Sequence, residues 1–517
     1  MPSTRKVRSA TLNRMRHTCG GVLISVSMIL LGSGCMSVGP DYEPPETVVP
    51  DLWTQDLRRG LNTNESDLQS WWTRFNDPLL QELIQESSAG NLGLRDALAR
   101  LVEARARTGI ASGEQLPSID ASGDIERGRL SRGVADGVDN SRQRTSTLYQ
   151  LGMDATWEID LWGRISRSVE SADATYQASL EDYRDALISL YADVALAYTD
   201  IRTFQARISA ALGNVETQRK TLRLVRDRRA SGLASDLEVA QAELNLARTE
   251  SLVPALRSGL KQSIHRLSVL IGRPPSTLYS RFVTVEPIPA PPSSIAVGAP
   301  AEVLRQRPDI RSAERALAAQ TAQIGVATAD LYPRFTLSGF FAFQKFGVTD
   351  LLNSKNLGYG FGPTMIWNVF DGGRIRSNIK VQDALTEQSL LNYEQTVLTA
   401  LQEVEDAMVG FVQESERRDT LARSVGAAQR SVDLVQTLYV TGLTDFQNVQ
   451  DQERSLFEQQ DALEASKGLV TTNLINLYQA LGGGWSPLRD DQKTATTNGP
   501  PPIKAETVSS QTHAADS

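Results

Sequence analysis

The chain of 517 residues predicts an internally duplicated α+β membrane protein, in which long helices alternate with strands of period-two hydrophobicity. Three observations predict this class. The chain repeats itself, each copy contains alternating segments, and each copy contains an apolar helical seam much longer than those of globular proteins. Charged residues make up 22% of the chain and aromatic residues only 6%, which suits long helices better than several dense cores.

The N-terminus has the pattern of a secretory signal peptide. Residues 1–20 carry five Lys or Arg and no acid, and the apolar run that follows, residues 21–31, is too short to span a bilayer. The run leads into LGSGC (31–35), which resembles the lipobox of bacterial lipoproteins. We therefore expect residues 1–34 to be a lipoprotein signal peptide and Cys35 to be the lipidation site.

In lipoproteins of this type, the cysteine thiol receives a diacylglycerol and the freed amine receives an acyl chain such as palmitate. The alternative for a lone cysteine is a buried apolar side chain. Met36 stands where an aspartate would suggest retention in the inner membrane, so the resemblance favours the outer membrane. Several acyl chains anchor a protein firmly where one chain is marginal.

Charge and composition exclude several classes of function. The formal net charge is −8, and removing the five basic residues of the leader would leave −13, which does not favour nucleic acid as a partner. Two cysteines and three histidines cannot supply a disulfide framework or a four-ligand zinc site. No catalytic constellation or phosphate-binding loop is present, so we expect neither an enzyme nor a metal site, and no cofactor beyond the lipid on Cys35.

The rest of the chain contains an internal duplication. Residues 157–272 align with residues 367–482 at a constant offset of 210, and an upstream match has an offset of 216. The aligned positions include Trp157 with Trp367, Gly163 with Gly373, Tyr183 with Tyr393, Gly232-Leu233 with Gly442-Leu443, and Gly272 with Gly482. Each copy therefore has one order of elements: a helical stretch (78–113 and 301–330), two alternating segments and two long helices.

The alternating segments predict β-strands. In residues 119–126 and 149–160, apolar side chains occupy the odd positions and polar ones the even positions; residues 335–343 and 359–369 repeat the pattern. Alternation over 8–12 residues with aromatic residues toward the ends is typical of transmembrane strands. The alternative is a half-buried soluble sheet. The leader, the aromatic residues and the polar loop at 127–145 favour the membrane.

The even positions carry six acids and no Lys or Arg. If the even-numbered faces of the strands point inward, the outer part of the lumen is anionic and favours cations. The alternative is that the acids only keep the wall of a water-filled channel hydrated. The six acids are Asp120, Asp124, Glu126, Asp154, Glu158 and Asp160.

The first long helix is expected at 164–230, which at about 1.5 Å per residue is roughly 100 Å long. Its seam advances by four and three residues alternately, the spacing of a coiled coil. The seam positions are Leu187, Tyr191, Val194, Tyr198, Ile201, Gln205, Ile208, Leu212 and Val215. A turn at 230–235 leads into a return helix that ends near Ile271, and the second copy does the same over 374–481 with a turn at 442–445.

Four strands in hydrocarbon would leave two open edges, and each unpaired backbone group there costs several kilocalories per mole. Closure therefore requires other chains. Three copies would give a trimeric 12-stranded transmembrane β-barrel, four strands per chain, continued by a long α-helical barrel. A tube lined by the polar strand faces is a conduit.

The expected domains follow from this order. After the signal peptide come a lipidated N-terminal arm (35–77), a first structural repeat (78–284), a Pro-rich linker (285–300) and a second structural repeat (301–482). Residues 483–517, rich in Thr, Ser and Pro, are expected to be a disordered tail.

The chain resembles the outer-membrane efflux proteins, the TolC-like family, and among them the NodT-type lipoproteins. The resemblance covers residues 35 to about 485. It is carried by CMSVGPDYEPP (35–45), by the stretch from LRQRPDI at 304 to FTLSG at 339, by WNVFDGGR (367–374), and by the turns SGLASD and TGLTDF. It implies a homotrimer in the outer membrane, embedded in its lipid and reaching into the periplasm, where it docks to an adaptor (membrane fusion) protein and an inner-membrane efflux pump.

The same resemblance implies roles for particular residues. Turns like those at Gly232, Leu233, Gly442 and Leu443 contact the adaptor, although a simple helix cap explains the glycines equally well. Asp451 matches an aspartate that faces the pore near the closed tip, so three copies would form a carboxylate ring; a solvated acid on a helix face is the alternative. The first copy has Gln241 at this position.

The predicted function is a passive exit duct of a tripartite efflux system that conducts small molecules from adaptor and pump to the exterior. A duct of a protein secretion system is the nearest alternative. A lipid-anchored periplasmic coiled-coil scaffold is a further alternative from a different class.

Overall fold

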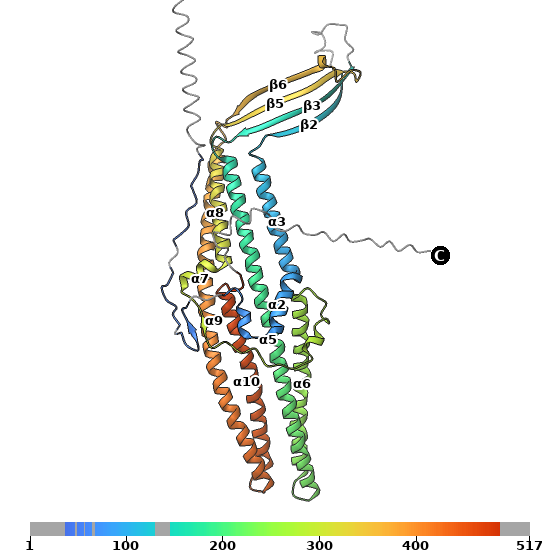
Figure 1. Ribbon diagram of the computed structural model, residues 1–517, viewed down its shortest axis with the longest axis vertical. Helices are drawn as coiled ribbons and strands as arrows, with labels where there is room; N and C mark the ends of the chain where they lie inside the picture. The colour runs from blue at the N-terminus through green and yellow to red at the C-terminus, as the bar shows by residue number, and fades with distance from the viewer. Residues whose placement is uncertain (1–36, 47–48, 56, 65–67, 130–144, 486–517) are drawn as a thin grey trace, which may run out of the picture.

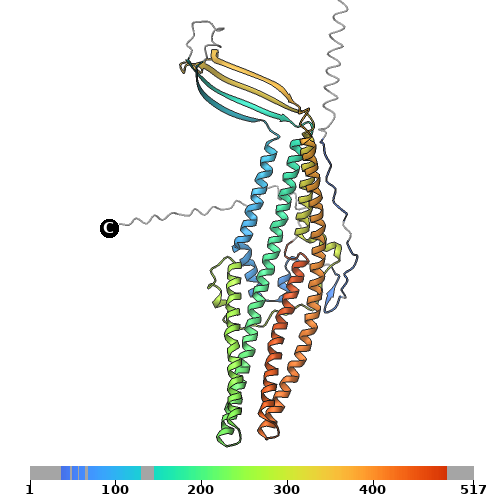
Figure 2. The same ribbon diagram turned by 180° about the vertical axis from the view of Figure 1, so that it is seen from behind.

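The computed structural model describes residues 37–46, 49–55, 57–64, 68–129 and 145–485. The described chain is elongated, with a four-stranded sheet at one end and two helical hairpin tips at the other (Figures 1 and 2). The expected signal peptide, Cys35 and the tail from residue 486 onward lie outside the described residues.

The sheet is antiparallel throughout, with the order β2-β3-β5-β6. Its strands are β2 (Ser118–Arg129), β3 (Thr145–Ile159), β5 (Arg334–Phe346) and β6 (Leu357–Ile366). Each copy contributes one neighbouring pair of strands, as the alternation predicts. Within the part of the chain that the structure describes, β2 and β6 each have one neighbouring strand, so both edges of the sheet are open.

Several strand boundaries differ from the prediction. β6 ends at Ile366 rather than at Val369, because its partner strand begins only at Arg334 and the preceding residue, Pro333, has no N–H to donate. The indole of Trp367 instead donates to the Leu331 carbonyl at 3.0 Å. At the other end, β2 and β3 extend further than expected, and most of the predicted 127–145 loop, residues 130–144, lies outside the described residues.

The long helices have equal lengths in the two copies. α5 (Arg164–Ala230) and α9 (Arg374–Val440) contain 67 residues each, and α6 (Asp236–Leu270) and α10 (Phe446–Ala480) contain 35 each. α5 and α9 both start after a glycine with positive φ, 77° at Gly163 and 87° at Gly373. The predicted 164–230 helix is therefore confirmed, and α5 with α6 and α9 with α10 form two long hairpins (Figure 1).

The two copies also make the same junction between sheet and helix. The Trp157 indole donates to the Gln115 carbonyl at 2.9 Å, and the Trp367 indole donates to the Leu331 carbonyl at 3.0 Å. These donors differ by 210 and these acceptors by 216 in residue number, the two offsets that the sequence alignment found.

The predicted seam of α5 is wrong at one position. Leu212 is 43% exposed, whereas its neighbour Ala211 is buried against Val253 and Leu256 of α6. The next seam position, Val215, is 3% exposed, so the departure at Leu212 is local and the seam continues beyond it.

The shorter helical stretches are interrupted where single helices were expected. The first consists of α2 (Pro78–Gly90) and α3 (Leu92–Gly113), separated by Asn91. The Asn91 side chain caps α3 by accepting from Leu94 N at 2.8 Å and donates to the Leu270 carbonyl at 2.8 Å. The second consists of α7 (Pro300–Gln306) and α8 (Pro308–Ala329), and the break falls at Arg307 because a residue before proline avoids the helical conformation.

The largest apolar core lies where the N-terminal arm, α2, α5 and α10 meet. Trp71 of the arm is buried and stacks on Tyr478 of α10 with the ring centroids 5.2 Å apart. Residues from the arm and from the Pro-rich linker pair as short parallel strands, β1 (Leu61–Asn62) with β4 (Ile295–Ala296). Trp485, assigned from composition to the disordered tail, is buried between the guanidinium groups of Arg184 and Arg311.

Candidate functional site

The even-numbered face of the sheet is mainly polar, although Phe340 and Phe346 also lie on it, and the odd-numbered face is mainly apolar. Strand register places Asp120 opposite Asp154 and Asp124 opposite Gln150, so four of the predicted lumen acids share the even-numbered face. These four are Asp120, Asp124, Glu126 and Asp154, and all are exposed within one chain. The only side-chain hydrogen bond among the described residues to any of the four runs from the Ser122 hydroxyl to Asp154 at 3.4 Å.

The remaining two predicted lumen acids are engaged at the helix junction instead. Glu158 forms a bidentate ion pair with Arg164, with both N–O distances at 2.9 Å. Asp160 lies one residue beyond β3, and its carboxylate accepts from the backbone N–H groups of Ile165 and Ser166 at the start of α5. Asp160 is therefore a helix cap and not part of the strand face, because the first N–H groups of a helix require an acceptor.

The odd-numbered face of the sheet is apolar and exposed. Phe361 is 85% exposed, and Tyr359 and Met365 are also exposed on the same strand. Apolar side chains on neighbouring strands continue this face, including Ile119, Ile125, Leu151, Met153, Leu337 and Phe341. A contiguous exposed apolar face that extends across the strands of a sheet marks contact with a membrane or with another protein. Among the described residues, no helix is both long enough and apolar enough to cross a bilayer.

Both hairpin tips have the same construction. Gly232 and Gly442 adopt φ of 75° and 78°, and the backbone N–H of the following leucine donates to the carbonyl five residues earlier. Leu233 is 67% exposed and Leu443 is 74% exposed. The turns lie at the end of the molecule farthest from the sheet (Figure 2). The two exposed leucines therefore belong to this end.

Asp451 lies in the second turn of α10, close to the second tip. Its carboxylate accepts from Arg454 at 2.8 Å and from Gln447 at 3.2 Å, both on the same helix. Asp451 therefore has a neighbouring guanidinium that compensates its charge, a feature that the prediction of a carboxylate ring did not include.

The two hairpins meet along a polar seam that the sequence analysis missed. Arg207 of α5 pairs with Asp461 of α10 at 2.8 Å, and Thr221 of α5 donates to Glu453 of α10 at 2.6 Å. Nearer the tip, Tyr439 of α9 donates to Glu238 of α6 at 2.7 Å. Burial next to that carboxylate raises the pKa of Tyr439 to about 12. In each of these three pairs, at least one partner differs between the copies at the offset of 210: Asp461 corresponds to Ser251, Thr221 to Ser431 and Tyr439 to Arg229. This loss of symmetry is the sequence signal that could have found the seam.

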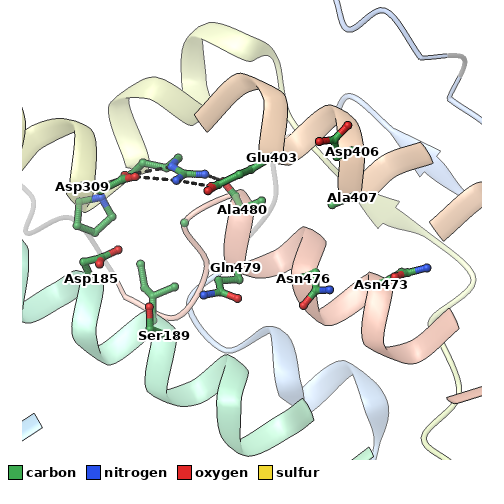
Figure 3. Close-up of a pocket in the computed structure, with 14 residues that line it drawn as sticks. Asp185, Ser189, Asp309, Glu403, Asp406, Ala407, Asn473, Asn476, Gln479 and Ala480 are labelled. Atoms are coloured by element: carbon green, nitrogen blue, oxygen red, sulfur yellow. Dashed lines mark hydrogen bonds and ion pairs between the residues drawn. The ribbon is translucent and has the colours of Figure 1, made fainter. Parts of the chain in front are cut away.

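Arg307 of the RPDI stretch lies in the wall of a polar cavity of about 520 Å³ between α5, α8, α9 and α10. Its guanidinium donates to Asp309 and Glu403, both at 2.7 Å, and to the Ala480 carbonyl at 2.8 Å. Figure 3 marks the bonds to Asp309 and Glu403 with dashed lines. The motif thus joins the start of α8 to α9 and to the end of α10.

Asp185 lines the same cavity from α5 (Figure 3). Burial, together with the nearby Asp309 carboxylate, raises the pKa of Asp185 to about 6. No group of three or more His, Cys, Asp or Glu among the described residues is arranged to hold a metal ion.

The first described residues of the N-terminal arm cross the junction between sheet and helices. A Cβ at Gly163 would lie 2.6 Å from the Ser37 hydroxyl oxygen, and Val38 N donates to the Trp162 carbonyl at 3.1 Å. The buried Arg167 side chain donates to Asp41 at 2.6 Å. The arm therefore begins against the end of β3, two residues after the predicted lipidation site.

Comparison with known proteins gives a consistent result. The sequence profile of the outer membrane efflux protein family matches residues 83–273 and 299–483. Nodulation protein T of Rhizobium leguminosarum bv. trifolii is 30% identical over 469 residues, which are 89% of this chain and 96% of that protein. A protein of Salmonella typhimurium named "Probable outer membrane lipoprotein SilC" is 27% identical, over 90% of this chain and 98% of its own length.

The solved structure of the outer-membrane channel OprN is similar throughout, with a TM-score of 0.81 and 35% identity. The similarity covers 87% of this chain and all of that one. These similarities favour a channel over a periplasmic scaffold.

Proposed function

The chain belongs to the outer membrane efflux protein family, and from this premise we propose that three copies close into a single duct. The protein resides in the outer membrane and is the exit duct for efflux, which is a channel function and not an enzymatic one. The observation that carries the proposed assembly is the four-stranded sheet with two open edges, one polar face and one exposed apolar face.

The cost of unpaired strand edges in a membrane favours closure of the sheet into a barrel. In hydrocarbon, every unpaired backbone group on β2 and β6 costs several kilocalories per mole, so the edges must pair with other chains. Twelve strands from three chains would bury all edges, turn the apolar faces toward lipid and enclose the acidic faces. Each repeat, 78–284 and 301–482, would contribute two strands and one long hairpin.

The duct works passively in this proposal. Substrate arrives from an inner-membrane pump through a periplasmic adaptor, and the exposed Leu233 and Leu443 at the tips contact that adaptor. The acids on the even strand faces line the outer lumen and favour cations, and Asp451 with Arg454 lies at the constriction near the tip. A covalent lipid on Cys35 anchors the arm beside the barrel rim.

Cross-linking between edge strands tests the assembly. A chain with Ser122→Cys on β2 and one of Gly358→Cys, Gly360→Cys or Gly362→Cys on β6 would form disulfides between chains in oxidised outer membranes. For the pairing register that matches, covalent trimers are expected on a non-reducing gel. Each single-cysteine variant serves as a control. Cross-linked products larger than a trimer would contradict a closed three-chain barrel. So would a gel that shows only monomers for all three cysteine pairs.

A further inference from the structure

Glu453 of α10 is a carboxyl group buried between the two hairpins near the tips, and it is only 4% exposed. Its Oε1 atom accepts from the Thr221 hydroxyl of α5 at 2.6 Å and from the Gln436 amide of α9 at 3.1 Å. One oxygen thus joins three helices. Among the described residues, no Lys, Arg or His forms an ion pair with Glu453, and its Oε2 atom makes no hydrogen bond.

The duplication supplies an internal comparison. At the offset of 210, Glu453 corresponds to Glu243 and Gln436 corresponds to Arg226. Glu243 is exposed and pairs with Arg226 at 2.6 Å. In the second copy the glutamate is kept, but the arginine is replaced by a neutral amide and the site is buried. A buried carboxylate without a cation is costly, so the second copy favours the protonated acid where the first copy favours the ion pair.

The hydrogen-bond geometry is compatible with a neutral acid. A carboxylic acid has one carbonyl oxygen that accepts and one hydroxyl that donates. Both protein donors approach the same oxygen, Oε1, which leaves Oε2 to carry the proton. Burial raises the pKa of Glu453, whereas the bonds from Thr221 and Gln436 act in the opposite direction.

The charged side chains around Glu453 do not compensate its charge. Lys220 of α5 and Asp433 of α9 line a groove of about 530 Å³ that also contains Thr221 and Gln436. On α10 itself, Asp451 pairs with Arg454, and Glu238 of α6 accepts from Tyr439 of α9. None of these charged groups shifts the pKa of Glu453.

We propose that Glu453 is a proton-responsive positioning residue of the tip, which fastens the two hairpins together as the neutral acid and favours their separation when it ionises. The inference deepens the proposed duct function and rests on it. Separation would expose the carboxyl group to water, where it ionises at a lower pH, so protons favour the fastened arrangement. Acid pH therefore narrows the tip, and a rise in pH loosens it.

Single-channel conductance of purified protein in planar bilayers, recorded as a function of pH, tests this inference. The wild type should show a conductance step that rises with pH, with a midpoint above the usual glutamate value. Glu453→Gln should remove the step and keep the conductance at its acidic level. Glu243→Gln, the equivalent change in the first copy, is the matched control and should leave the step in place.

Two further variants change the step in different ways. Thr221→Val removes a hydrogen bond that stabilises the carboxylate, so the midpoint of the step should shift to higher pH. Gln436→Arg restores the cation of the first copy, which stabilises the ionised acid between the hairpins, so the rise in conductance with pH should be lost. If Glu453→Gln does not assemble, these two variants test the inference, and a step that both leave unchanged would overturn it.

The outcomes separate the two proposals. Channels whose pH step is the same in the wild type and in Glu453→Gln would overturn the role of Glu453 and leave the duct intact. Wild-type protein that forms no channels at any pH would overturn the duct itself.

Discussion

Asp185 lines the polar cavity formed by α5, α8, α9 and α10, and its pKa is raised to about 6 by burial and by the neighbouring Asp309 carboxylate. Below about pH 4, Asp185 is protonated in both the folded and the unfolded chain, and its effect on the free energy of unfolding is at its most favourable. As the pH rises from 4 through 6, the unfolded chain loses its proton first, so stability falls across this window and stays lower above it.

We therefore expect Asp185→Asn to stabilise the protein at pH 7.5, by up to about 2 kcal/mol, and to lose this advantage below pH 4. The measurement is the unfolding temperature as a function of pH. Asp383→Asn, which changes an exposed acid of α9, is the control and should give a difference from the wild type that does not vary across this window. A gain for Asp185→Asn that is equally large at pH 4 and pH 7.5 would refute the raised pKa.

Asp451 and Arg454 make opposite contributions to the charge near the tip. If three Asp451 side chains form the constriction, Asp451→Ala should raise the leak conductance of the closed trimer, and Arg454→Gln should strengthen the preference for cations. Reversal potentials and conductance in bilayers measure both effects. Unchanged conductance in Asp451→Ala would remove this residue from the constriction.

At the level of single residues, the sequence predicted positions whose chemistry is local. Gly232 and Gly442 could be placed because a helix that reverses in a short turn needs positive φ. The sequence prediction placed Asp160 on the strand face and did not single out Glu453. The backbone of α5 recruits Asp160 as a cap, and Thr221, 232 positions earlier in the chain, reaches Glu453.

At the level of elements, the duplicated hairpins present similar tips, each with one exposed leucine after the glycine. Leu233→Asp and Leu443→Asp should weaken binding of the periplasmic adaptor because they replace exposed apolar contact surface with charge. Neither change should affect trimer stability, since neither side chain packs in the core. Adaptor affinity is measured by surface plasmon resonance on purified protein.

Leu244→Asp, an exposed leucine of α6 away from the tip, is the control for the tip variants. Equal loss of affinity in the control and in both tip variants would argue against the tips as the docking site.

The elements themselves were largely predictable, because period-two alternation and a long 3.5-residue seam are strong patterns. The 67-residue α5 has the predicted boundaries. The break at Asn91 was missed because the Asn91 amide also donates to a tertiary partner, the Leu270 carbonyl. The break at Arg307 has a local cause, the following Pro308, which the sequence prediction did not use.

At the level of the whole molecule, the arm connects the predicted lipid to the junction between sheet and helices. Ser37 and Val38 contact residues 162–163 at the end of the sheet, and Arg167 holds Asp41. The lipid on Cys35 would therefore enter the bilayer beside the barrel rim, where the strands themselves already hold the protein.

Cys35→Ser should consequently reduce the amount of trimer in the outer membrane, while each trimer that does form should conduct normally. Quantitative blotting of membrane fractions measures the first quantity and single-channel recording the second. A normally inserted variant trimer that does not conduct would contradict this division of roles.

In the proposed assembly, three chains enclose a continuous water-filled passage, which four strands from one chain cannot do. Conductance of purified wild-type protein in a planar bilayer tests this passage most directly. Discrete, uniform channel openings are expected from a sample whose mass is that of a trimer. Trimers that insert into the bilayer and leave it electrically silent at every pH and voltage would contradict the proposed assembly.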